Sequence, residues 1–202
     1  MAWTTPVTHL VGDFIDAPAW NSEVTGNMNA LRANYATTLP VSPSDGDQAI
    51  LVDSTTSPTY QWLFRYNASN STAYKWEFIG GSKLSGYVDA GGTTASTTYV
   101  EVGSTLTLTL PRAGIYTVDH GCYTDGPEAY ASFASFTIGA AAPSDSNGIQ
   151  WYGSGTSGSK AVVGVQITAA ASDTLIYKVK IGGGAAATFA KKGMTVTPVR
   201  VS

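Results

Sequence analysis

Apolar and polar residues follow two different periods along this chain. Between residues 16 and 35, apolar side chains recur every three or four positions, which predicts one amphipathic helix. Asp16 can cap the first turn of this helix, and Pro18 lies where a missing N–H has no cost. The apolar stripe of the predicted helix consists of Trp20, Val24, Met28, Leu31 and Tyr35.

This predicted helix needs a partner, because a helix of about 18 residues is marginally stable alone in water. It can pack on β structure of the same chain. It can also associate with copies of itself, since Asn27 and Asn34 fall on a heptad seam where polar residues set register and strand number. The residues predicted for oligomerisation are Trp20, Val24, Asn27, Met28, Leu31, Asn34 and Tyr35.

After a proline-containing joint at residues 39–43, the period changes to two. Strands are expected at residues 48–52, 60–66 and 74–79, which would form a small antiparallel meander. Trp62, Phe64, Trp76 and Phe78 share the aromatic faces of the last two strands and are predicted to pack together as a neck. The alternative use of such a face is to stack on a sugar ring.

The rest of the chain predicts a β-sandwich. Short runs of period-two alternation are separated by turn residues such as Gly, Asp, Asn and Pro, and this spacing is typical of a two-sheet, jelly-roll-like head. Strands are expected at residues 99–102, 105–110, 114–124, 131–138, 148–152, 161–169, 174–181, 186–189 and 194–201. The predicted fold is therefore mainly β, with an N-terminal arm and helix (1–40), a meander (41–82) and a head (83–202).

Composition narrows the classes of partner. Charged residues make up 12% of the chain and the formal net charge is −3, so no basic stripe is available for nucleic acid. No run of about 18 apolar residues predicts membrane insertion. Residues 1–10 lack the basic and apolar regions of a signal peptide, so we expect synthesis in a host cytoplasm.

Three motifs suggest chemistry, and none has the context that its chemistry needs. Residues 153–158 read G-x-G-x-x-G, but a strand rather than a helix is predicted to follow them. His120 and Cys122 would share one face of a strand while Asp119 faces away, which prevents a catalytic relay. The turn that starts at Asp145 lacks the distal acid of a calcium loop, and no carboxylate pair stands out for glycoside hydrolysis. We therefore expect no catalytic residues, no cofactor and no metal.

The first 81 residues resemble the N-terminal modules of minor tail proteins and tail fibres of long-tailed bacteriophages. The likeness lies in Trp3, Pro6, the Gly12-Asp13-Phe14-Ile15 run and the segment around Trp20, and it continues through the aromatic strands that end at Gly80-Gly81. More loosely, residues 108–116 and 195–201 resemble jelly-roll heads of phage fibres and spikes. The resemblance implies a virion protein, commonly a homotrimer, that is attached through its N-terminus to other virion proteins and exposes its C-terminal head.

The leading hypothesis is thus a trimeric tail protein whose head binds a host-surface glycan or protein. Its predicted contact loops are 124–130, 140–150 and 153–160, and the candidate contact residues are Tyr123, Tyr130, Trp151 and Tyr152. A second hypothesis is a capsid decoration protein that stabilises the shell without a receptor, since the chain has no extended shaft. A third is an enzyme that acts on envelope polysaccharide.

Overall fold

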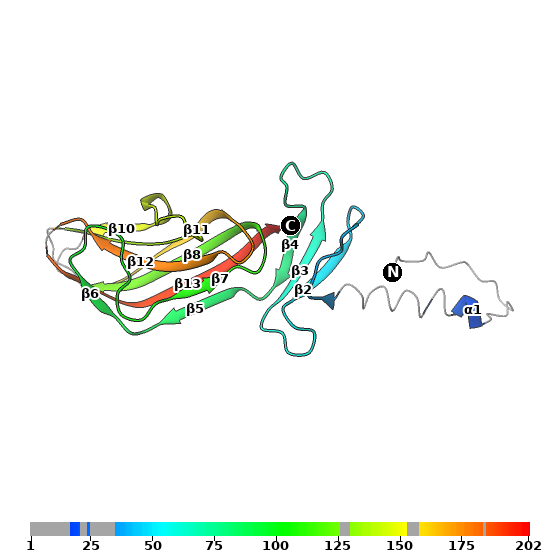
Figure 1. Ribbon diagram of the computed structural model, residues 1–202, viewed down its shortest axis with the longest axis horizontal. Coiled ribbons are helices and arrows are strands. Elements are labelled where there is room, and N and C mark those ends of the chain that lie inside the picture. Colours follow the sequence, from blue (N-terminus) through cyan, green and yellow to red (C-terminus); the bar gives the residue numbers. More distant parts are fainter. Residues whose placement is uncertain (1–16, 21–23, 25–34, 126–129, 153–157, 184) are drawn as a thin grey trace. The chain divides into compact units, whose positions relative to one another are not determined.

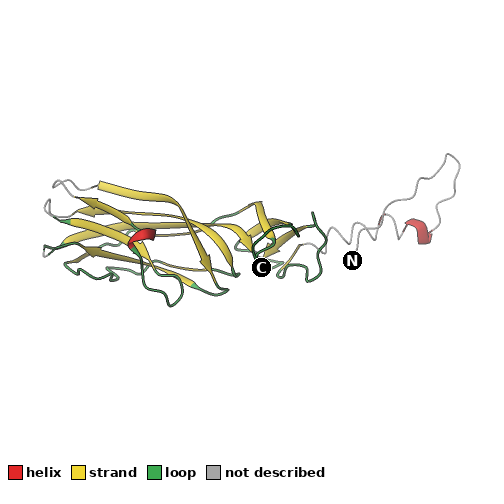
Figure 2. Cartoon of the chain, turned by 90° about the horizontal axis from the view of Figure 1, so that it is seen from above, coloured by secondary structure: helices red, strands yellow, loops and turns green. Residues whose placement is uncertain are grey.

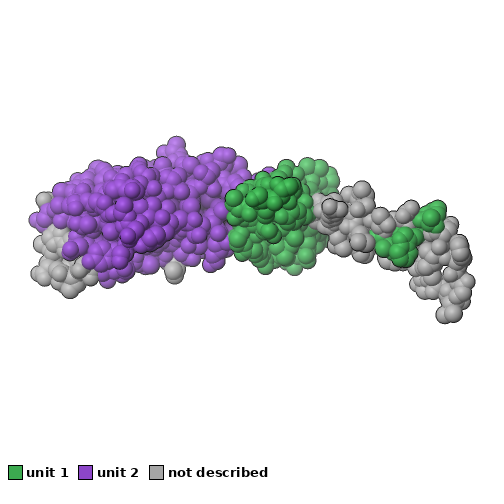
Figure 3. Space-filling view, turned by 90° about the horizontal axis from the view of Figure 1, so that it is seen from below, with its two compact units in different colours: residues 1–69, 78–82 green, residues 70–77, 83–202 purple. Residues whose placement is uncertain are grey.

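The computed structural model describes residues 17–20, 24, 35–125, 130–152, 158–183 and 185–202, and this part of the chain is mainly β (Figure 1). Strands predominate over a short α-helix, α1 (Ala17–Trp20), and a single helical turn, Asp145–Asn147 (Figure 2). The chain divides into two compact units (Figure 3). The first contains residues 1–69 and 78–82, and the second contains residues 70–77 and 83–202.

The first unit is built on a small sheet. Strand β1 (Tyr35–Ala36) runs parallel to β2 (Gln48–Val52), and β2 pairs antiparallel with β3 (Gln61–Tyr66). β4 (Trp76–Gly81) follows β3 in the strand order. Leu51 and Trp62 face each other in register and are fully buried, as is Phe64.

Three of the four predicted neck residues lie in this unit. The ring of Phe64 lies 6.1 Å from that of Trp62 and 5.9 Å from that of Phe78, both edge-on. Trp62 Nε1 donates a hydrogen bond of 2.7 Å to the Ser82 carbonyl oxygen. Trp76, the fourth residue, is buried in the second unit, where it pairs with Val201.

The structure corrects the C-terminal end of the predicted helix. Tyr35 lies in strand β1, opposite Ile50, and therefore does not belong to a helical stripe. At the other end, α1 covers four residues and leaves the Trp20 side chain 55% exposed, while Val24 is half-buried. Asn27, Met28, Leu31 and Asn34 lie outside the described residues.

The second unit consists of two antiparallel sheets. In the first, β13 (Ala187–Val201) pairs with β8 (Gly114–Asp125) on one side and with β5 (Leu84–Val88) and β6 (Gly92–Thr94) on the other. β8 in turn pairs with β11 (Gly158–Ala169). The second sheet has the order β10 (Ile149–Tyr152), β9 (Ala131–Phe136), β12 (Thr174–Ile181) and β7 (Thr107–Thr109).

Period-two alternation places the core between these sheets. Along β8 every second residue from Gly114 to Thr124 is buried, and Leu175, Tyr177, Val179 and Ile181 are buried along β12. Leu106 and Leu110 are also buried while Thr107 and Thr109 are exposed, as the alternation predicts. The prediction of a mainly β fold is thus confirmed.

Three strands, β1, β5 and β6, are missing from the sequence prediction, and one predicted strand is absent. β5 and β6 fall where the sequence indicated a boundary, because Gly86 and short polar residues weaken the alternation. Residues 99–102 form no strand, although Val100 makes a bridge to Val179. The strands expected at 186–189 and 194–201 are one strand, β13, with a bulge between Ala190 and Gly193.

Candidate functional site

The four aromatic residues predicted to contact a receptor lie in different environments. Tyr152 on β10 is 75% exposed and Tyr130 is 38% exposed, so both rings are accessible. Tyr123 is half-buried on β8, with Lys191 Nζ 5.9 Å from its ring centroid. The structure corrects the predicted contact role of Trp151. Its indole is buried against Phe189, with 6.1 Å between the ring centroids, so Trp151 is a core residue.

Parts of the predicted contact loops, residues 126–129 and 153–157, lie outside the described residues. In the loop at 140–150, the Asp145 carboxylate accepts hydrogen bonds from the Tyr99 hydroxyl at 2.8 Å and from Lys180 at 3.0 Å. These two donors lower the pKa of Asp145, and they occupy the carboxylate that a calcium loop would need. Within the described ranges, no group of three or more His, Cys, Asp or Glu side chains is placed to hold a metal ion.

His120 and Cys122 are both buried on the inner face of β8, and Asp119 lies on the outer face. Burial lowers the pKa of His120 to about 4 and raises the pKa of Cys122 to about 11. His120 Nε2 lies 3.0 Å from the Asn147 carbonyl oxygen, and its ring packs edge-on against Phe136 and Tyr177. At neutral pH both groups are therefore uncharged, and no thiolate or imidazolium is available for nucleophilic chemistry.

Lys192 is a buried charged residue of the described part of the head. Its ammonium group donates hydrogen bonds to the carbonyl oxygens of Val102 and Ser104, and the cost of burial lowers its pKa. Lys192 of β13 therefore has a structural role, because it holds the loop that precedes β7 against β13.

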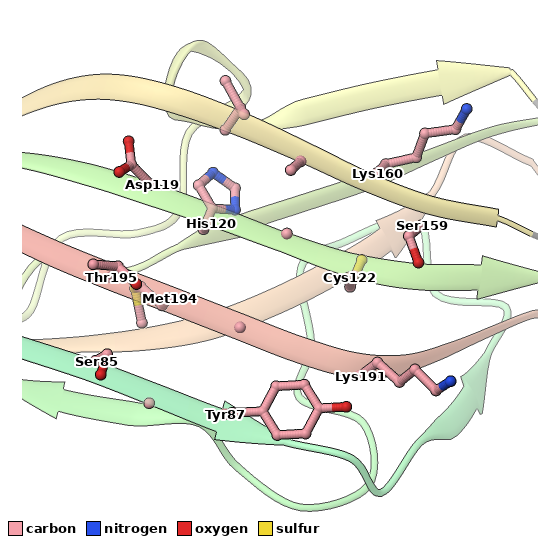
Figure 4. Close-up of a pocket in the computed structure, with 15 residues that line it drawn as sticks. Ser85, Tyr87, Asp119, His120, Cys122, Ser159, Lys160, Lys191, Met194 and Thr195 are labelled. Atoms are coloured by element: carbon pink, nitrogen blue, oxygen red, sulfur yellow. The ribbon is translucent and has the colours of Figure 1, made fainter.

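A shallow hollow of about 560 Å³ lies on the outer face of the first sheet (Figure 4). Tyr87 of β5, Gly193 of β13, Gly121 of β8 and Ala161 of β11 lie opposite one another in register across four strands. Of these four residues, Gly121 and Gly193 have no side chain, and Ala161 has only a methyl group. The floor is therefore nearly bare backbone, and the Tyr87 ring, 63% exposed, stands at one end of it.

Polar side chains line the rest of the hollow. Ser85, Thr195 and Asp119 lie on one side of the floor, and Ser159 and Lys191 lie on the other (Figure 4). Two hydrogen bonds fix the ends: the Tyr87 hydroxyl donates to Asp89 Oδ1 at 3.1 Å, and the Gly164 N–H donates to Asp119 Oδ1 at 2.8 Å. The side chains of Tyr87 and Asp119 are thus held in position before any ligand binds.

Sequence reasoning missed this hollow, because its residues come from four strands that the sequence cannot align. The available signal was Gly121, a glycine inside a strong strand pattern, whereas Gly193 lies in the break between two predicted strands. An interior strand glycine often marks close approach of a ligand or of another backbone.

The described residues contain no helix long and apolar enough to cross a membrane. No family model matches the chain, and no curated protein matches it in sequence.

Among solved structures, the chain is similar to a chain of infectious bursal disease virus, Gx strain, with a TM-score of 0.36 and 9% identity. It is also similar to the isomalto-dextranase of Arthrobacter globiformis T6 complexed with panose, with a TM-score of 0.31 and 14% identity. These likenesses cover 68% and 76% of this chain, but only 40% and 24% of the other two. Both are too slight to bear on function.

Proposed function

We propose that this chain is a structural protein of a bacteriophage virion: a homotrimeric tail-fibre or minor tail protein whose head binds the host surface. The observation that carries the proposal is the resemblance of residues 1–81 to phage tail modules, in a chain whose remaining part folds as an antiparallel two-sheet unit. In this role the N-terminal segment attaches to other virion proteins, and the chain inserts into no membrane and binds no nucleic acid.

The head is proposed to be a jelly roll. One sheet has the order β11-β8-β13 with β5 and β6 beside β13, and the other has the order β10-β9-β12-β7. From β6 onward, successive strands alternate between the two sheets except at the β9–β10 hairpin. This winding supports a jelly roll, in which two Greek keys are combined in eight strands.

A binding role is favoured over catalysis. The His120 and Cys122 side chains are buried and neutral, and the Asp145 carboxylate is engaged by Lys180 and Tyr99. We therefore propose a non-enzymatic protein without a cofactor.

Immunogold labelling of intact particles tests this proposal. Antibodies raised against the purified chain should label the tail, and pre-incubating host cells with the purified chain should reduce adsorption of particles. Absence of label from the particle would contradict a virion role altogether.

Capsid decoration is the second candidate. It is favoured by the lack of a shaft between the meander and the head, since β5 begins at Leu84, directly after β4 ends at Gly81. In that case gold label should cover the capsid, and the purified chain should bind undecorated capsids but leave adsorption unchanged.

A further inference from the structure

We propose that the hollow on the β5–β13–β8–β11 face is a binding site for a neutral saccharide, with Tyr87 as its stacking platform. This inference deepens the proposed role of the head in host-surface binding. It can nevertheless be tested on the purified chain, independently of where that chain lies on a particle.

The first step of the argument is Tyr87. The Tyr87 ring is 63% exposed beside the hollow, and the hydrogen bond from its hydroxyl to Asp89 holds it in place. A pyranose ring has an apolar C–H face that stacks on such a ring, and its hydroxyl groups then reach polar neighbours. Because the Tyr87 side chain is already fixed, binding loses little side-chain entropy.

The second step is Gly193. Nothing within the chain requires glycine there: its φ is not positive, and a Cβ would meet only the edge of the Tyr87 ring, at 3.8 Å. Gly121 differs, because a Cβ there would lie 2.6 Å from the Lys160 carbonyl oxygen. Glycine costs an interior strand position about 0.5–1 kcal/mol relative to alanine. The open space above Gly193 is therefore unexplained by packing and fits a ligand that lies against the backbone.

The third step is the polar lining, which selects the ligand class. Asp119 supplies an acceptor, Lys191 supplies donors, and Ser85, Ser159 and Thr195 supply both. The one carboxylate of the lining that lies on this outer face, Asp119, is offset by the ammonium group of Lys191, so an ion gains little net attraction. Neutral hydroxyl groups, each a donor and an acceptor, match this lining.

A second copy of the chain fits the hollow less well. The centres of protein interfaces are depleted in charged residues, whereas charged side chains border this floor closely. The volume of about 560 Å³ lies within the usual range for small-molecule sites, about 300–1,000 Å³.

The experiment titrates the full-length chain with short linear oligosaccharides of glucose, galactose, mannose and N-acetylglucosamine, using ligand-observed NMR and calorimetry. Oligogalacturonate serves as the acidic comparison. At least one neutral series should bind, and Tyr87→Ala should weaken its binding by about tenfold while Tyr87→Phe retains most of it. Gly193→Val should fill the floor and weaken binding by at least about tenfold, and Gly193→Ala should weaken it less.

Thr197→Val is the matched control, because Thr197 lies on the same strand and face as Gly193 but outside the lining of the hollow. Its binding should equal that of the wild type, and circular dichroism should show all variants folded. The proposal is overturned if no neutral series binds the wild type, if oligogalacturonate binds more tightly, or if Tyr87→Ala and Gly193→Val leave binding unchanged. It is also overturned if Gly193→Val alters only the oligomeric state, which would assign the face to a second copy.

Discussion

At the scale of single residues, the most unusual group in the head is the His120 side chain. It is 3% exposed between Phe136 and Tyr177, and its Nδ1 has no hydrogen-bond partner among the described residues. Burial of a group that water would protonate below pH 6.5 links the stability of the head to pH.

The free energy of unfolding should fall as pH falls from about 6.5 toward 4. Because the folded-state pKa of His120 is lowered to about 4, the unfolded chain binds a proton at higher pH than the folded chain. The loss should approach about 3 kcal/mol at pH 4, since one pKa unit corresponds to about 1.4 kcal/mol. Urea titrations at several pH values measure it.

The variant His120→Gln separates this effect from that of the carboxylates. Glu101 and Asp145, whose pKa values are lowered by Lys178 and Lys180, weaken the fold only at more acidic pH. The free energy of unfolding of this variant should stay constant between pH 6.5 and 5, whereas that of the wild type should already fall in this range. Equal slopes for both proteins would show that His120 does not titrate in this range.

Trp151 and Tyr152 form a matched pair, because they are neighbours on β10 that face opposite sides. Trp151→Ala should lower the free energy of unfolding by about 3 kcal/mol, since it leaves a cavity beside Phe189. Tyr152→Ala should change it by less than about 0.5 kcal/mol, because the ring is 75% exposed. Denaturant unfolding of both variants measures these changes. Similar losses of free energy of unfolding in the two variants would contradict the burial assigned to Trp151 and the exposure assigned to Tyr152.

At the scale of elements, alternation predicted the strands with two well-separated faces. The bounds of β2 and β12 match the prediction, and β8 differs by one residue. β8 and β12 alternate strictly between buried and accessible positions, and β2 does so as far as Leu51. β13 was split in the prediction because Lys191-Lys192-Gly193 reads as a break. In the structure Lys191 adopts a φ of 49° and the strand continues through a bulge.

The hollow was beyond sequence reasoning for a related reason. Gly193 and Gly121 become neighbours only through the register of β13 on β8, and Tyr87 comes from a strand that the pattern did not predict. Local alternation contains no information about which strands pair. The buried state of Trp151 was missed because a residue beside a turn looks accessible until the opposing sheet is placed.

The end of β4 offers a test with adjacent glycines. Gly81 has a φ of 126°, and a Cβ there would collide with the Gln61 carbonyl oxygen, so Gly81→Ala should cost about 1–3 kcal/mol. Gly80 has open space around it and no positive φ, so Gly80→Ala should be neutral or slightly stabilising. Thermal unfolding of the two variants measures the difference in their stability. Equal stability would contradict the prediction and would mean that the backbone at Gly81 relaxes to accept a side chain.

At the scale of the whole molecule, the proposed trimer predicts that the N-terminal segment holds the copies together. Deleting residues 1–34 removes the predicted oligomerisation seam except Tyr35 but keeps β1 paired with β2. By light scattering, the full chain should have three times the mass of the 21.0 kDa protomer, and the truncated chain should be a folded monomer. A truncated chain that remains a trimer would assign assembly to the β units instead.

The position of β13 also constrains how the head forms on the ribosome. β5, β6 and β8 all pair with β13 but are synthesised well before it, so their edges stay unsatisfied until residues 187–201 emerge. Pairing across such long sequence separations is slow, and open strand edges promote aggregation. A nascent chain interrupted before β13 would therefore expose unpaired strand edges, and such chains should aggregate more readily than complete ones.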